Sequence, residues 1–152
     1  MNATIEDLPG FALMGITCRN SPDKIDYGSE WRRFDDIQHT VEPLSADDHF
    51  YGAYFGVEPE SDVIDFVAGM AVEKGAEPPT DALVVRAVPG GRYAVFPCTM
   101  ETIGETWAAI YGEWEPPEGL TFDATRPDLE VFAPEGLEGP APVRILVPMK
   151  QV

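Results

Sequence analysis

The feature that most constrains the fold of this chain is an internal repeat. Shifting the sequence by 80 positions places residues 19–34 on residues 99–114 without a gap and also aligns the two cysteines. Three aromatic pairs coincide at the helical spacing i, i+4 and i+7: Tyr27 with Trp107, Trp31 with Tyr111, and Phe34 with Trp114. Because only 11% of the residues are aromatic, this match favours a duplication. The alternative is that two unrelated amphipathic helices with aromatic faces have been slid into agreement.

The first half of the chain predicts one helix among several strands. An apolar run over residues 11–19 suits a buried strand, and helical spacing predicts a helix over residues 22–37. Ser21 is the expected N-cap of that helix, with Pro22 at its first position. Residues 50–57 and 63–73 are rich in aromatic and apolar residues and flank a turn-like segment, so they predict a hairpin. Residues 82–88 are a candidate for a further strand.

The second half predicts the same order of elements. Residues 92–98 form a candidate strand and residues 100–114 a helix with an apolar side, capped by Thr99 and ended by the prolines at 116 and 117. Two strands, 129–132 and 143–149, flank the Pro- and Gly-rich segment 133–142. We therefore predict an α+β fold of two β-α-β-β halves, about 11–73 and 91–149, related by a pseudo-twofold axis in a mainly antiparallel sheet. A cleft is expected where the halves meet.

Length and charge narrow the class of protein. A chain of 152 residues with 44% hydrophobic content predicts a single domain over residues 1–152. The net charge of -17 repels phosphate and anionic lipid, which argues against direct nucleic-acid or membrane partners. The same charge is also typical of a solubilising surface or of adaptation to high salt.

The sequence lacks the patterns of a membrane-spanning segment, a signal peptide, a metal site and a nucleotide-cofactor site. No apolar stretch is long enough to span a bilayer and the first basic residue is Arg19, so we predict a cytoplasmic protein. Cys18 and Cys98 form no zinc-type cluster and only two histidines are present, so we predict reduced cysteines and no metal site. Neither a P-loop nor a Rossmann fingerprint occurs, and we expect no cofactor.

A series of short motifs resembles a known family. They occur in the family's order over nearly the whole chain, as E-W-R-R-F (30–34), Y-G-A-Y-F (51–55), G-G-R-Y-A-V-F (90–96), T-W-x-x-I-Y-x-x-W-x-P (106–116), D-L-E-V-F (128–132) and V-P-M-K (147–150). Together they resemble the GyrI-like or AraC-type effector-binding domain. The resemblance implies a duplicated α+β fold with a central hydrophobic groove that binds small molecules, often lipophilic cations.

The resemblance also carries expectations about context. Many members of the family are the sensor part of a transcription regulator. No segment before Phe11 or after Lys150 predicts a helix-turn-helix. We therefore expect a standalone member, a group that includes a gyrase inhibitor, drug-binding modules and hydrolases of strained cyclopropane-containing compounds.

Glu130 is the candidate for the functional acid, because its place in D-L-E-V-F matches the family's acidic residue on a late strand. A carboxylate in an aromatic cleft loses hydration and selects for positive charge. The alternative is that Glu130 is one of 27 acids, exposed on an edge strand. The aromatic candidates for the ligand site offer π-faces to a cation, although each also suits ordinary core packing: Tyr51, Tyr54, Tyr93, Trp107 and Tyr111.

Binding of a lipophilic cationic or aromatic molecule is thus the function that the sequence favours. One alternative is carboxylate-assisted hydrolysis of a reactive electrophile, in which Glu130 activates water and a tyrosine stabilises the leaving group. No Ser-His-Asp order or G-x-S-x-G motif supports nucleophilic catalysis. The other alternative is inhibition of a protein partner through the acidic surface, as in the gyrase inhibitor.

Overall fold

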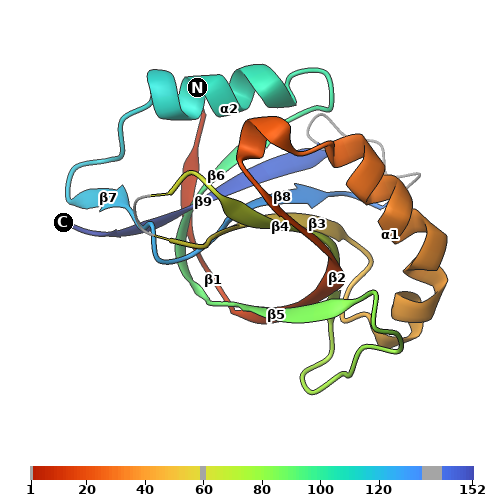
Figure 1. Cartoon of the computed structure of the whole chain (residues 1–152). Coiled ribbons are helices and arrows are strands. Elements are labelled where there is room, and N and C mark those ends of the chain that lie inside the picture. Colours follow the sequence, from red (N-terminus) through yellow and green to blue (C-terminus); the bar gives the residue numbers. More distant parts are fainter. Residues whose placement is uncertain (1, 59–60, 135–141) are drawn as a thin grey trace.

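The computed structural model describes residues 2–58, 61–134 and 142–152. These residues form a curled nine-stranded sheet with two α-helices against it (Figure 1). In chain order the elements are β1 (Thr4–Leu8), β2 (Phe11–Asn20), a 3-10 turn η1 (Pro22–Lys24), α1 (Tyr27–Val41), η2 (Glu42–Leu44), β3 (Phe50–Gly56), β4 (Ile64–Val72), β5 (Val84–Val88), β6 (Gly91–Cys98), α2 (Ile103–Gly112), β7 (Leu120–Phe122), β8 (Asp128–Phe132) and β9 (Val143–Gln151).

The order of strands in the sheet is symmetric. It runs β1-β6-β9-β8-β3-β4-β2-β5, with β7 paired to β9 beside this path, and every pairing is antiparallel. The unit β2-α1-β3-β4 is followed by an equivalent unit β6-α2-β8-β9, and β3 meets β8 in the middle of the sheet. The α+β fold with duplicated β-α-β-β halves is therefore confirmed.

The two halves exchange their first strands. β1 leads into β2 but pairs with β6 of the second half, whereas β5 leads into β6 but pairs with β2 of the first half. The registers of the β1:β6 and β2:β5 pairings are equivalent in the repeat. Leu8 pairs with Gly91 and Phe11 pairs with Val88, and the 80-residue shift converts one pair into the other. This exchange, which was not predicted from the sequence, pairs a strand of each half with the other half.

The crossing of these two strands depends on glycine. A Cβ atom added to Gly90 would lie 2.5 Å from the backbone nitrogen of Gly10, and one added to Gly10 would lie 2.8 Å from that of Gly90. Real side chains do not tolerate such contacts with backbone. The two backbones can therefore cross at the pseudo-twofold axis only because both positions lack a side chain.

Strand alternation divides the buried residues between the two faces of the sheet. One face packs on itself inside the curl, with Leu13, Ala53, Val95, Leu129 and Leu146 in a single cluster. The opposite face carries the helices: α1 covers a cluster with β2 and β4, and α2 covers a cluster with β6 and β9. Figure 1 shows the two helices on separate parts of the sheet.

Both helices begin later than the sequence predicted. Pro22 starts only a three-residue 3-10 turn, because Ile25 is extended (φ -85°, ψ 129°) and separates that turn from α1. The N-cap of α1 is Asp26, whose side chain accepts a hydrogen bond from the Ser29 amide, and so the prediction of Ser21 as its cap is wrong. α2 runs from Ile103 to Gly112, and it begins late because residues 99–102 form a turn. Its N-cap position is Thr102, so the prediction of Thr99 as its cap is wrong. Within the described part of the chain, neither helix has the length and apolar character to cross a bilayer.

The predicted strands are present, and two more were missed. β2, β5, β6, β8, β9 and the hairpin of β3 and β4 all match their predicted segments within a few residues. β1 was missed because all but the last of its five residues are exposed, and β7 because it has only three residues. Most of the Pro- and Gly-rich segment 133–142 lies outside the described residues.

The crossing gives a direct test of the exchange. We expect Gly90→Ala to lower the free energy of unfolding by about 1–3 kcal/mol, because the new methyl group must displace backbone. Urea unfolding measures the loss. Gly112→Ala is the control, since nothing lies within 4 Å of the added atom, and its stability should be unchanged or slightly raised. Equal stability of the two variants would contradict the close crossing.

Candidate functional site

A pocket of about 900 Å³ lies between α1 and α2, on the helix-bearing face of the sheet. Its volume falls in the range of small-molecule sites. The walls come from both halves of the repeat, and many of the lining residues are related by the pseudo-twofold axis: Tyr27 with Trp107, Trp31 with Tyr111, and Tyr54 with Phe132. The predicted cleft between the halves is therefore present as a pocket with aromatic walls.

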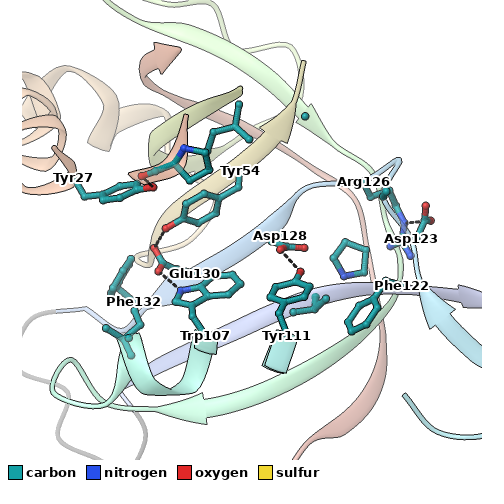
Figure 2. Close-up of a pocket in the computed structure, with 18 of the residues that line it drawn as sticks. Tyr27, Tyr54, Trp107, Tyr111, Phe122, Asp123, Arg126, Asp128, Glu130 and Phe132 are labelled. Carbon is teal, nitrogen blue, oxygen red and sulfur yellow. Dashed lines mark hydrogen bonds and ion pairs between the residues drawn. The ribbon is translucent and has the colours of Figure 1, made fainter. Parts of the chain in front are cut away.

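Glu130 lies in this pocket as a buried carboxylate, 7% exposed. Its Oε1 accepts a hydrogen bond of 2.8 Å from the hydroxyl of Tyr54 on β3, and its Oε2 accepts one of 2.7 Å from Nε1 of Trp107 on α2. Figure 2 shows the carboxylate between these two side chains. Both oxygens are thus held by neutral donors from different elements, which fixes the position of the negative charge.

The backbone explains why a long side chain fits here. β3 and β8 pair over five residues, and the central pair of this ladder is Gly52 with Glu130, so the pseudo-twofold axis passes between them. A Cβ atom on Gly52 would lie 3.1 Å from Oε1 of Glu130 and 3.1 Å from the Phe66 ring. The glycine therefore leaves the space that the Glu130 carboxylate occupies.

Burial shapes the protonation of this group. Loss of hydration raises the pKa of Glu130, and the hydrogen bonds from Trp107 and Tyr54 act in the opposite direction. Burial raises the pKa of Tyr54 far above its usual range, and the neighbouring Glu130 carboxylate raises it further. Tyr54 consequently keeps its proton and remains a donor to Glu130.

A second carboxylate lines the pocket two residues earlier on β8. Asp128 points to the same face as Glu130 and accepts a hydrogen bond from the hydroxyl of Tyr111 on α2. Burial raises the pKa of Asp128 to about 6, although the hydrogen bond from Tyr111 lowers it. Asp128 is therefore mostly ionised near neutral pH.

The basic residue in the pocket wall is engaged elsewhere. Arg126 pairs with Asp123 at 3.0 Å, and its Nη2 donates to the carbonyl oxygens of Arg92 and Met149 at 2.9 and 2.7 Å. Its guanidinium also lies over the Tyr93 ring, 4.8 Å from the centroid. Over the residues that the structure describes, no Lys, Arg or His forms an ion pair with either carboxylate of β8.

The structure brings four of the six predicted site residues together and places two elsewhere. Tyr54, Trp107, Tyr111 and Glu130 line the pocket, whereas Tyr51 and Tyr93 do not. Tyr51 packs with the cluster inside the curl and donates to Asp47 at 2.7 Å, and Tyr93, 1% exposed, belongs to the same cluster.

Tyr51 and Tyr93 lie outside the pocket because side chains alternate between the two faces of a strand with a period of two residues. Tyr51 and Tyr54 stand three residues apart on β3 and so face opposite sides of the sheet. Tyr93 likewise faces away from the helices, since its neighbours Ala94 and Phe96 pack under α2. The expectation that Tyr51 and Tyr93 line the groove is wrong for this reason.

Among the pocket residues that were not selected as site residues, four carried a signal in the sequence. Asp128 and Phe132 flank Glu130 at spacing two on one strand and must share its face. Tyr27 occupies the position that the repeat assigns to Trp107. Trp31 likewise occupies the position that the repeat assigns to Tyr111. It lines the pocket and packs edge-on against Phe132, with ring centroids 5.4 Å apart.

Comparison with known proteins agrees with this geometry. Residues 1–150 match the family described as the GyrI-like small molecule binding domain. The chain belongs to this family. The predicted resemblance is thereby confirmed, and the GyrI-like domain spans both halves of the repeat.

Relatives of this GyrI-like domain include a transcription regulator and several solved structures. The chain is 29% identical over 131 residues to the transcriptional regulator BrlR of Pseudomonas aeruginosa strain PAO1, covering 81% of this chain and 47% of the regulator. It thus spans about half the length of that relative. The structure of SAV2435 bound to tetraphenylphosphonium is similar with a TM-score of 0.77 at 11% identity, covering 99% and 94% of the two chains. The C-terminal domain of EcmrR is similar with a TM-score of 0.70 at 12% identity, covering 99% and 98%.

The raised pKa of Asp128 predicts a pH-dependent cost in stability. The folded chain binds a proton on the Asp128 carboxyl more tightly than the unfolded chain does. The stability that this proton contributes is therefore complete below the pKa of the unfolded side chain and is lost as pH rises through about 6. We expect Asp128→Asn, which cannot ionise, to be more stable than the parent by about 1–2 kcal/mol at pH 7.5 and by roughly a third of that at pH 4.5, which lies just above the pKa of the unfolded side chain.

Urea unfolding at the two pH values measures this difference. Asp62→Asn, at an exposed position, is the control and should change stability little at either pH. A stability gain for Asp128→Asn that is the same at pH 4.5 and pH 7.5 would contradict a buried, ionising carboxylate.

Proposed function

We propose that this GyrI-like domain binds lipophilic cations with aromatic groups in the pocket between α1 and α2, with Glu130 as the counter-charge. The observation that carries the proposal is the Glu130 carboxylate, buried among aromatic rings and held by two neutral donors. A buried negative charge without a cationic partner is costly, and a ligand cation offsets that cost.

The shape and chemistry of the walls favour a bulky aromatic ligand. Tyr27, Trp31, Tyr54, Trp107 and Tyr111 line the pocket and offer ring faces and edges to a ligand. Covering about 250 Å² of apolar ligand surface contributes roughly 6 kcal/mol. Each cation–π contact adds about 0.5–2 kcal/mol. These contacts and the Glu130 charge offset the costs of association, which leaves roughly −6 kcal/mol, a dissociation constant of tens of micromolar. A small cation without aromatic rings covers too little apolar surface to reach this affinity.

The comparisons support the same class of ligand. SAV2435, which shares the fold, has been solved with tetraphenylphosphonium, a lipophilic cation. The similarity to the transcriptional regulator BrlR favours a role in which the domain senses or sequesters the molecule that it binds. Hydrolysis and inhibition of a protein partner, the alternatives from the sequence, stay predictions.

A pair of probes with the same shape and opposite charge tests the proposal. We expect tetraphenylphosphonium to bind with a dissociation constant of tens of micromolar and tetraphenylborate, its anionic counterpart, to bind at least about 100-fold more weakly, because the pocket is anionic. Isothermal titration calorimetry measures both. Glu130→Gln should weaken tetraphenylphosphonium binding by about 10- to 100-fold, as expected for loss of a buried charge.

Glu30→Gln is the matched control for this variant. Glu30 is also a buried glutamate, 8% exposed, but it pairs with Arg33 at 2.6 Å and does not line the pocket. Its substitution should leave tetraphenylphosphonium binding unchanged, and melting curves verify that both variants fold. Equal affinity in the parent and Glu130→Gln would show that Glu130 is not the counter-charge.

Affinity should also depend on pH. Protonation of Asp128 removes negative charge from the pocket as pH falls below about 6, and burial also raises the pKa of Glu130. We expect tetraphenylphosphonium to bind about 3- to 10-fold more tightly at pH 8 than at pH 5. The double variant Glu130→Gln, Asp128→Asn should show little pH dependence over this range. A pH profile that is identical in the double variant would assign the effect to other groups.

A further inference from the structure

Three carboxylates line the pocket, and two of them, Glu130 and Asp128, form no ion pair with a basic residue that the structure describes, whereas Asp123 pairs with Arg126. We infer that the domain recognises flat dications whose positive charges stand about 7 Å apart, one charge at Glu130 and the other at Asp128, since two residues along a strand span about that distance. This inference rests on the proposed function and specifies its ligand class.

The two carboxylates are held apart by equivalent contacts with α2. Trp107 donates to Glu130, and Tyr111, one helical turn further along, donates to Asp128. The two rings are parallel within 4°, with centroids 6.3 Å apart, so the spacing of the helix turn matches that of the strand. Figure 2 shows the two contacts side by side. Because each carboxylate has its own donor, the two are fixed in separate places instead of converging on one atom.

The charge of the pocket favours two positive centres over one. A monocation at Glu130 leaves the Asp128 carboxylate partly buried, with a hydrogen bond from the Tyr111 hydroxyl and no ion pair among the described residues. Arg126, the basic residue in the wall, forms its ion pair with Asp123, and its Nη2 donates to two carbonyl oxygens. A second ligand charge at Asp128 therefore neutralises a group that nothing else in the described wall neutralises.

The geometry also selects the framework that links the two charges. The carboxylates lie in a row along β8, between the aromatic side chains of α2 and those of β3. A rigid flat linker keeps its charges at the carboxylate spacing and stacks on aromatic rings, whereas a flexible chain loses conformational entropy on binding. Two directly linked pyridinium rings, with a nitrogen at each far end, have this shape and a charge spacing of the same size.

Methyl viologen and 1-methyl-4-phenylpyridinium are matched probes for the inference. They share two linked six-membered rings, but the first carries two positive charges and the second carries one. We expect oxidised methyl viologen to bind the parent protein at least about 10-fold more tightly in calorimetry, since each added neutralised contact is of that order. A bispyridinium with a vinyl link between its rings, which moves the charges further apart, should bind more weakly than methyl viologen.

Two aspartate variants complete the experiment. Asp128→Asn should bring the two affinities within about 3-fold of each other, mainly by weakening the dication. Asp47→Asn is the control, because Asp47 also accepts a tyrosine hydroxyl hydrogen bond, from Tyr51, but lies outside the pocket. It should preserve the preference for the dication.

The outcomes separate the two proposals. Equal binding of methyl viologen and the monocation by the parent protein would overturn the dication inference and leave the proposed function intact. Equal or tighter binding of the vinyl-linked compound would overturn the spacing. Failure of both probes and of tetraphenylphosphonium would overturn both proposals. Because the comparison of the probes with the parent protein needs no variant, it tests the inference even if Asp128→Asn does not fold.

Discussion

At the pseudo-twofold axis of this sheet, two strands meet at one residue pair, and there is room for a single long side chain. Glu130 takes that room because its partner is Gly52. A duplicated fold would otherwise place the same group twice at its centre, and two glutamates there would collide and repel. The symmetry of the backbone therefore produces a groove with matching aromatic walls, while the asymmetry of one pair gives that groove a charge.

The two carboxylates of β8 also contribute to the attachment of α2. α1 buries Phe34 and Val41 against the sheet and is held by apolar packing. α2 packs Ile103 and Ile110 against β6 and β9 and is also joined to β8 by the hydrogen bonds of Trp107 and Tyr111. Part of its attachment therefore depends on the same groups that give the pocket its charge. A molecule that engages these carboxylates acts directly on the contact between α2 and the sheet.

The fold was predictable to the extent that it depends on local pattern and on the repeat. Apolar strands, the hairpin of β3 and β4, and the equivalence of the two halves are all visible in the order of residues. β1 carries exposed side chains, and its pairing with β6 is a tertiary contact that no local pattern contains. The cap of α1 was misassigned because Ser21 and Asp26 are both good caps, and the extended conformation of Ile25 decides between them.

The site was predictable where a family motif and strand alternation agree. Glu130 followed from the motif, and Asp128 follows from it by the two-residue period. Tyr51 and Tyr93 were selected as aromatics without applying that period, which would have placed Tyr51 opposite Tyr54. The contacts of Trp31 with Phe132 and of Tyr111 with Asp128 arise only when elements far apart in sequence pack together.

The exchange of β1 and β5 has a consequence for motion. Each half contributes a strand to the ladder of the other, so pulling the halves apart would break the β1:β6 and β2:β5 pairings together. A clamshell movement about a hinge between the halves is therefore too costly to admit a molecule. A molecule must instead enter through rearrangements at the rim, where the exposed side chain of Met100 borders the pocket and can change rotamer without disturbing the sheet.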